Sequence, residues 1–190
     1  MYKNVTFRDK VKVPPQLLGG DVEEAVRESL RKQYEGSVNE DLGSVISVTG
    51  VDEIGEGEIE PEDASAYYPV KCSALTYLPE LHEVVLGEVS EMTEFGAFVT
   101  IGPIEALCHV SQVMDDYVSY NEEQNVLSGE NGDKVLQEGD VIKARITAVS
   151  LSEDDDHKIN LTMRQPGLGK IEWIEEEAEE EKEEDNDGQG

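Results

Sequence analysis

Hydrophobic and polar positions alternate at the start of the chain. Valine or phenylalanine occupies four of the five odd-numbered positions from Val5 to Val13, and threonine, arginine or lysine occupies the even-numbered ones. A period of two is typical of a strand with one buried face. The strand should end at Pro14 and Pro15, because neither proline offers an amide hydrogen to a ladder.

A helical period follows. The helix should begin at Asp21, whose carboxylate, together with that of Glu24, can cap amides of the first turn, and should end at Gly36. The expected buried face consists of Val22, Ala25, Val26 and Leu30. Three basic residues near the C-terminal end fit the helix dipole better than a ligand; they are Arg27, Arg31 and Lys32.

Two further strands are predicted before Pro79, at residues 44–51 and 67–77. The glycine- and acid-rich stretch between them, residues 52–65, indicates a protruding loop or a distorted hairpin. Residues 1–78 therefore form a small β-α-β-β unit, and Pro79 marks a domain boundary.

From Leu81 onward the pattern consists of short strands separated by glycine-bearing turns, which indicates a small barrel of the oligonucleotide-binding kind. The five predicted strands lie in 82–91, 95–101, 105–110, 140–149 and 157–164. The segment 114–139 is too long for a hairpin loop, so we expect it to be partly ordered. The acidic tail lacks apolar periodicity, and we expect disorder toward its end.

Composition narrows the class of protein. The chain has 190 residues, 37% of them hydrophobic, and a formal net charge of −29. It can fold, but no apolar run approaches the roughly 18–20 residues of a membrane helix, and the first ten residues lack the apolar core of a signal peptide. Two cysteines are too few for a disulfide scaffold. We expect a cytoplasmic protein without membrane contact; the acid excess favours a cytoplasm rich in salt over an ordinary acidic protein.

Signatures of catalysis are missing. GLGK at 167–170 is not a phosphate-binding loop, because the first glycine of that motif would fall at Arg164. The histidines have no metal-ligand spacing, and no cofactor motif is present. The acidic pairs and runs Asp115-Asp116 and 154–156 could hold magnesium, but such runs usually face water. We expect no active site, no metal and no cofactor.

A binding surface has more support. Six of the fifteen basic residues lie in 134–170, and four of these fall on the outward positions of the last two predicted strands. They are Lys143, Arg145, Lys158 and Arg164. The inward positions of the same strands are apolar: Ile142, Ala144, Ile146, Ala148, Ile159, Leu161 and Met163.

Aromatic side chains accompany these cations. Phe95 and Phe98 flank two small residues, and a glycine bulge could bring both rings to one surface, where they would stack on bases. His109 could add a third planar group. Spacing alone leaves open whether one or both phenylalanines instead fill the barrel core.

The stretch 87–113 resembles the S-one RNA-binding domain, with GEV at 87–89, FGAFV at 95–99 and HVS at 109–111. The resemblance implies that both phenylalanines and His109 form a stacking face and that a basic residue of the last strand holds phosphate. Lys158 stands where many members carry arginine. Ser150 stands where many carry aspartate, so this edge of the site departs from the family pattern.

Long stretches elsewhere resemble the family of archaeal RNA polymerase subunits called E-prime, or subunit seven. They are MYKNVTFRDKVKVPP, RKQYEGSVNEDLGSVISVTGV, HVSQVMDDYVSY and LTMRQPGLGKIEWIEEE. The resemblance covers about residues 1–175 and implies an α+β chain: a truncated ribonucleoprotein-like docking domain over 1–79, an S-one barrel over 80–166 and a C-terminal extension over 167–190. The acidic composition would suit a haloarchaeal member.

The resemblance also implies a function. Members are non-catalytic subunits that pair with a small helical subunit, called subunit four, to form a polymerase stalk, dock near the clamp and contact emerging RNA during initiation, elongation and termination. The implied RNA-facing residues are Phe95, Phe98, His109, Lys143, Arg145, Lys158 and Arg164. The implied docking tip contains Pro14, Pro15, Ile54, Gly55, Gly57 and Ile59. Leu168 and Trp173, large apolar residues outside the barrel strands, are candidates for the contact with subunit four.

Two other classes remain as alternatives. A free-standing RNA-binding adaptor of RNA processing or translation could use the same barrel and would purify without polymerase subunits. A nuclease with the barrel as its targeting module would need a metal-binding carboxylate constellation, which the sequence does not offer.

Overall fold

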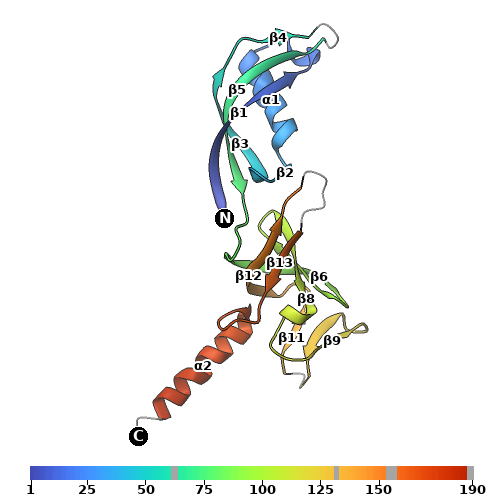
Figure 1. Ribbon diagram of the computed structural model, residues 1–190, viewed down its shortest axis with the longest axis vertical. Helices are drawn as coiled ribbons and strands as arrows, with labels where there is room; N and C mark the ends of the chain where they lie inside the picture. Colours follow the sequence, from blue (N-terminus) through green and yellow to red (C-terminus); the bar gives the residue numbers. More distant parts are fainter. Residues whose placement is uncertain (61–63, 131–132, 153–157, 188–190) are drawn as a thin grey trace. The chain divides into compact units, whose positions relative to one another are not determined.

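The computed structural model describes residues 1–60, 64–130, 133–152 and 158–187, with side chains up to residue 179. The chain divides into two compact units: Met1–Leu78 makes up most of one, and Pro79–Ser150 makes up most of the other. The first unit is α+β and the second is almost entirely β, apart from its last helix (Figure 1).

The N-terminal unit is an antiparallel sheet with one helix on one face. The sheet order is β1-β5-β3-β2, and β4 pairs with β5. Its elements are β1 Tyr2–Val13, η1 Pro15–Leu17, α1 Val22–Tyr34, β2 Val38–Asn39, β3 Gly43–Ile54, β4 Glu58–Ile59 and β5 Ala66–Tyr77. The core between α1 and the sheet consists of Val11, Val13, Ala25, Val26, Leu30, Val48, Val70 and Cys72. The predicted β-α-β-β order is confirmed.

Helix α1 begins as its sequence predicts. The Asp21 carboxylate accepts a hydrogen bond from the Glu23 amide at 3.0 Å, which satisfies one of the free amides of the first turn. Arg27, Arg31 and Lys32 each form an ion pair with a glutamate four positions away, at 2.9 Å for Arg27–Glu23 and 2.6 Å for Lys32–Glu28. These pairs stabilise the helix. The expected burial of Val22 is wrong: the first turn lies at the edge of the core and leaves this side chain exposed.

The second unit is a closed barrel of five strands. Its order is β12-β6-β7-β8-β13, and β13 pairs with β12 to close it. The strands are β6 Val84–Thr93, β7 Gly96–Ile101, β8 Ile104–His109, β12 Val141–Ser150 and β13 Lys158–Thr162. The β13–β8 pairing is parallel, whereas the other pairs that close the barrel are antiparallel. The predicted oligonucleotide-binding architecture is confirmed.

Two predicted orientations in the barrel are wrong. Ala148 is exposed rather than inward, because the β12–β13 register shifts between Ile146 and Ala148 and turns the following residues to the other side. Thr162 has the parity of an outward residue but is buried, because its hydroxyl donates to Gln112 Oε1 at 2.9 Å and this side chain covers it.

The described residues between β8 and β12 form more regular structure than the sequence indicates. After η2, Val110–Gln112, they form a three-stranded antiparallel sheet in the order β11-β10-β9. Its strands are β9 Val118–Asn121, β10 Val126–Gly129 and β11 Val135–Gln137. Leu127 and Leu136, which pair across β10 and β11, are fully buried, which explains why this segment holds together as a small folded insert.

The acidic extension is helical, so the expectation of a disordered tail is wrong for the residues that the structure describes. After β14, Gly169–Lys170, helix α2 runs over Ile171–Asp187 and extends away from the barrel (Figure 1). Glutamate and alanine have favourable helix propensity, which the argument from charge overlooked. The helix is anchored at its start, where Trp173 is only 7% exposed and lies 3.3 Å from the Cβ position of Gly169.

Trp173 should be the main anchor of α2. The Lys134 ammonium lies 5.6 Å from its ring and also pairs with Glu177 at 2.6 Å, so the insert and the helix meet at this residue. We expect Trp173→Ala to lower the free energy of unfolding by about 3 kcal/mol, the usual cost of removing a buried tryptophan, and to reduce helical circular dichroism. Glu175→Ala, an exposed change on the same helix, should stay within about 0.5 kcal/mol. Equal effects of the two changes would contradict the anchoring role.

Candidate nucleic-acid interface

The two phenylalanine rings meet on the barrel surface. Phe95 is 47% exposed, Phe98 is half-buried, and their ring centroids lie 6.3 Å apart at an interplanar angle of 87°. The predicted glycine bulge is absent from β7, which pairs with β8 in unbroken register from Gly96 to Ile101. Phe95 instead lies in the turn before β7, so strand alternation does not fix its direction and the ring can reach Phe98.

Gly96 permits this turn. Its φ of +153° is one that other residues rarely adopt, and a Cβ atom there would lie 2.3 Å from the Cys108 carbonyl oxygen on β8. Next to it, the Val110 amide donates to the Phe95 carbonyl at 2.8 Å. The close approach of the two strands therefore holds the Phe95 backbone against the end of β8.

His109 lies beside the rings. It ends β8 and pairs with Gly96, and Phe98 pairs with Leu107, so Phe98 and His109 are diagonal neighbours on the outward side. Its Nδ1 accepts a hydrogen bond from the Ser111 amide at 3.2 Å and lies 2.9 Å from the Ser111 hydroxyl. Because Nδ1 accepts, the neutral imidazole carries its proton on Nε2, where it can donate to a base or a phosphate.

Strand β13 extends this surface. Asn160 pairs with Leu107, so the exposed residues of β13 continue the outward row that contains Phe98. Lys158, two positions before Asn160, is exposed on the same side. Ser150, where the S-one pattern often has aspartate, pairs directly with Lys158. Rings, imidazole and ammonium group thus lie on three adjacent strands.

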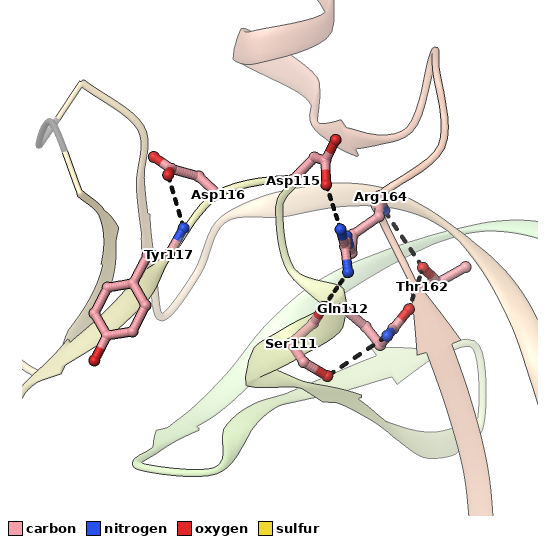
Figure 2. A network of polar contacts seen from close by, with 7 residues as sticks. All are labelled: Ser111, Gln112, Asp115, Asp116, Tyr117, Thr162 and Arg164. Atoms are coloured by element: carbon pink, nitrogen blue, oxygen red, sulfur yellow. Dashed lines mark hydrogen bonds and ion pairs between the residues drawn. The ribbon is translucent and has the colours of Figure 1, made fainter.

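Arg164 belongs to a polar network that the sequence did not reveal (Figure 2). Its guanidinium pairs with Asp115 and donates to the Ser111 carbonyl at 3.4 Å. The Met163 amide adds a bond to the Gln112 carbonyl at 2.8 Å. A phosphate would have to compete with the Asp115 carboxylate for Arg164. No spacing rule links positions 115 and 164, so only the fold could show this pairing.

Lys143 and Arg145 do not join the ring surface. On β12 they pair with Leu86 and Val84 of β6, whereas Phe98 pairs with Glu91. Leu86 and Glu91 are five residues apart on β6, which corresponds to about 16 Å. Arg145 Nη1 also lies 3.5 Å from the His82 carbonyl oxygen. The seven cations and rings expected on one face therefore fall on two separate parts of the barrel.

The residues expected at the docking tip gather at one end of the N-terminal sheet. Ile59 pairs with Ala66, which also pairs with Val13, the residue before Pro14. Ile59 is 69% exposed, and Pro15, Gly55 and Gly57 are exposed as well. Ile54 differs, because it is half-buried and packs against the core of this unit.

Leu168 and Trp173 lie together in a groove that also contains Lys134 and Met163. Leu168 is half-buried and Trp173 is buried, so most of the tryptophan surface is already used within this chain. This packing within the chain accounts for Trp173 and leaves little of its side chain for a partner.

The described part of the chain shows neither a metal site nor a membrane-spanning helix. No three histidine, cysteine, aspartate or glutamate residues there are placed to hold a metal ion, and no helix there is both long and apolar enough to cross a membrane. Asp115 and Asp116 make the polar contacts drawn in Figure 2, and residues 154–156 lie outside the described residues.

Burial raises the pKa of the Cys108 thiol to about 12 and that of Cys72 to about 11, so both remain protonated.

Comparison with models of known protein families identifies the types of the two domains. Residues 8–64 match the model described as "SHS2 domain found in N terminus of Rpb7p/Rpc25p/MJ0397", and residues 78–164 match the S1 RNA binding domain. The chain therefore combines an N-terminal domain of the Rpb7 type with a domain of the S1 type.

Relatives over the whole length identify the family. The DNA-directed RNA polymerase subunit Rpo7 of Sulfolobus acidocaldarius is 37% identical over 177 residues, which cover 93% of this chain and 97% of the relative. Rpo7 of Saccharolobus solfataricus is 38% identical over 92% of this chain and 97% of its own. RNA polymerase II subunit 7 of Arabidopsis thaliana is 25% identical over a stretch that covers 61% of this chain and 66% of the relative. This chain belongs to the Rpo7 family of RNA polymerase subunits, as the sequence resemblance indicated.

Proposed function

We propose that this chain is the non-catalytic stalk subunit of a cytoplasmic archaeal RNA polymerase and that its barrel binds the emerging transcript. The observation that carries the RNA contact is the Phe95–Phe98 ring pair beside His109 on an S1 barrel. The rings stack on bases of any sequence, Nε2–H of His109 donates a hydrogen bond, and Lys158 attracts phosphate. This combination supports weak, sequence-tolerant binding.

The N-terminal unit would attach the chain to the polymerase core near the clamp. Ile59, an apolar side chain at the end of the sheet, is exposed next to Pro15 and the two glycines of the tip, a surface suited to insertion into a preformed socket. The second partner is subunit four, the small helical subunit of the stalk. Together the two contacts would hold the barrel beside the RNA exit, where it acts in initiation, elongation and termination.

Affinity purification of the tagged chain from its own cells, in a buffer at the salt concentration of those cells, tests the proposal. We expect mass spectrometry to find the large polymerase subunits and one small helical partner in constant proportion to the chain. An Ile59→Asp variant should lose the large subunits, because a carboxylate cannot enter an apolar socket without a large desolvation cost. Recovery of RNA-processing or ribosomal components in place of polymerase would establish the free-standing adaptor and refute the stalk.

A further inference from the structure

Arg164 continues the outward row of β13. Lys158 and Asn160 are exposed on this strand. Beyond the end of the strand, Met163 is buried and Arg164 is exposed, as the alternation of inward and outward positions requires. The row of groups that can face RNA would therefore extend to this guanidinium. In the structure, however, Arg164 forms an ion pair with Asp115 (Figure 2).

Hydrogen bonds connect Arg164 to the imidazole of the ring surface. The Ser111 carbonyl accepts a bond from Arg164 Nη1 at 3.4 Å, and the Ser111 amide donates to His109 Nδ1 at 3.2 Å. Between them, the Thr162 hydroxyl donates to Gln112 Oε1 at 2.9 Å. Arg164 thus contacts a residue that itself holds His109, which places its guanidinium at the margin of the surface proposed to bind RNA.

The ion pair itself is open to solvent. The side chains of Arg164 and Asp115 are 44% and 77% exposed, and an exposed ion pair is screened by salt and contributes little to stability. The neighbouring acid has another role, because the Asp116 carboxylate accepts bonds from the amides of Tyr117 at 2.7 Å and of Glu130 at 3.1 Å. Asp116 therefore serves the backbone of the insert, whereas Asp115 faces Arg164.

This pairing changes what Arg164 offers to a ligand. A free guanidinium binds a phosphate group with two parallel hydrogen bonds and opposite charge. With Asp115 in place, a phosphate must displace a carboxylate and is repelled by its negative charge. The row of cations that begins at Lys158 is therefore cut short at its other end.

We propose that Asp115 limits the affinity of the barrel for RNA: by occupying Arg164, it keeps a phosphate-binding cation out of the contact with the transcript. The inference rests on the proposed function, because it requires a single strand of RNA on the ring surface. A transcript that passes the barrel during elongation needs a contact that releases quickly, and most differences in affinity arise from the rate of release. A masked arginine weakens the hold on RNA and leaves the rings unchanged.

Titration of the full-length chain with a labelled single-stranded RNA, followed by fluorescence anisotropy, tests this. Asp115→Asn should bind about three- to tenfold more tightly than the wild type, because the neutral amide releases the charge of Arg164 to a phosphate. The slope of log affinity against log salt concentration should become steeper by about 0.7, the value for one further phosphate contact on a single strand. Asp115→Ala, which removes the acceptor altogether, should give the same two changes.

Two controls make the effect specific to the pair. In an Arg164→Gln background, Asp115→Asn should bring no gain in affinity, since no guanidinium remains to be released. Glu123→Gln removes the same charge from an exposed position of the insert and should leave the salt slope unchanged. Circular dichroism of all variants should match the wild type, because the pair is exposed.

The outcomes separate the inference from the proposed function. Unchanged affinity of Asp115→Asn, with binding still lost when both rings are removed, overturns the masking role and leaves the ring surface intact. An equal gain in the Arg164→Gln background would mean that the carboxylate repels RNA without acting through Arg164, which also overturns the inference. So would a loss of affinity in Asp115→Asn. A wild-type chain that binds no RNA refutes the RNA contact and the inference together.

Discussion

Replacing both rings, Phe95→Ala with Phe98→Ala, should lower the affinity of the chain for single-stranded RNA by about two orders of magnitude. Base stacking on an aromatic side chain contributes about 1–3 kcal/mol per base, and 1.4 kcal/mol corresponds to a factor of ten. The two rings lie in edge-to-face contact, so removing one also frees the other from its position. Fluorescence anisotropy with labelled oligonucleotides of several sequences measures the change and shows whether it is independent of sequence.

Two controls make this result specific. Phe98 is half-buried, so its truncation also removes packing; Phe98→Leu keeps an apolar side chain of similar bulk but removes the flat ring, and should lose the stacking part alone. Tyr117→Ala removes an exposed aromatic side chain of the insert and should leave affinity unchanged. If the double variant binds RNA as the wild type does, the ring surface is not the RNA contact.

Stacking has a further consequence for so acidic a chain. Phosphate contacts act through charge, and the net charge of −29 opposes them everywhere except near local cations. Among the described residues, Lys158 is the exposed lysine of the row formed by β7, β8 and β13. Arg164, the next candidate along the chain, is paired with Asp115. Stacking is not weakened by salt in this way, so a ring surface can hold RNA where a purely basic surface could not.

The sequence predicted the fold because its signals are local. Period-two alternation located the barrel strands, and the Asp21 cap with its helical spacing located α1. Two orientations in the barrel failed: Ala148, which follows a shift in the β12–β13 register, and Thr162, which is buried against Gln112. The helical tail was missed because high charge was taken as a sign of disorder although glutamate favours helix.

The candidate site was harder to predict, because it depends on contacts between distant positions. The rings and His109 could be found from their motif, but the partner of Arg164 is 49 positions away in sequence and no pattern indicates it. Leu86 was visible as an apolar residue in HEVVLGEVSE, yet its exposure follows only from the parity of β6 relative to the closed barrel. That Lys143 and Lys158 lie on different parts of the barrel also required the strand order.

Gly96→Ala should destabilise the barrel unit by about 2–6 kcal/mol, since strained backbone and overpacking each cost about 1–3 kcal/mol. Its Cβ atom would lie 2.3 Å from the Cys108 carbonyl oxygen, a backbone atom that cannot move without opening the β7–β8 ladder. The chain has one tryptophan, Trp173, which lies in the barrel unit, so denaturant unfolding followed by its fluorescence reports on this unit.

Gly139→Ala separates the cost of backbone strain from the cost of the steric contact. Gly139 also has a positive φ, +85°, but a Cβ atom there meets nothing within 4 Å, so this change should cost only the backbone strain of about 1–2 kcal/mol. The difference between the two variants measures the steric contact at Gly96. Because the Phe95 carbonyl bonds to the Val110 amide beside this contact, Gly96→Ala should also weaken RNA binding under conditions where the barrel remains folded, whereas Gly139→Ala should not. Equal destabilisation by both variants would mean that the strands can separate freely and that the turn does not position Phe95.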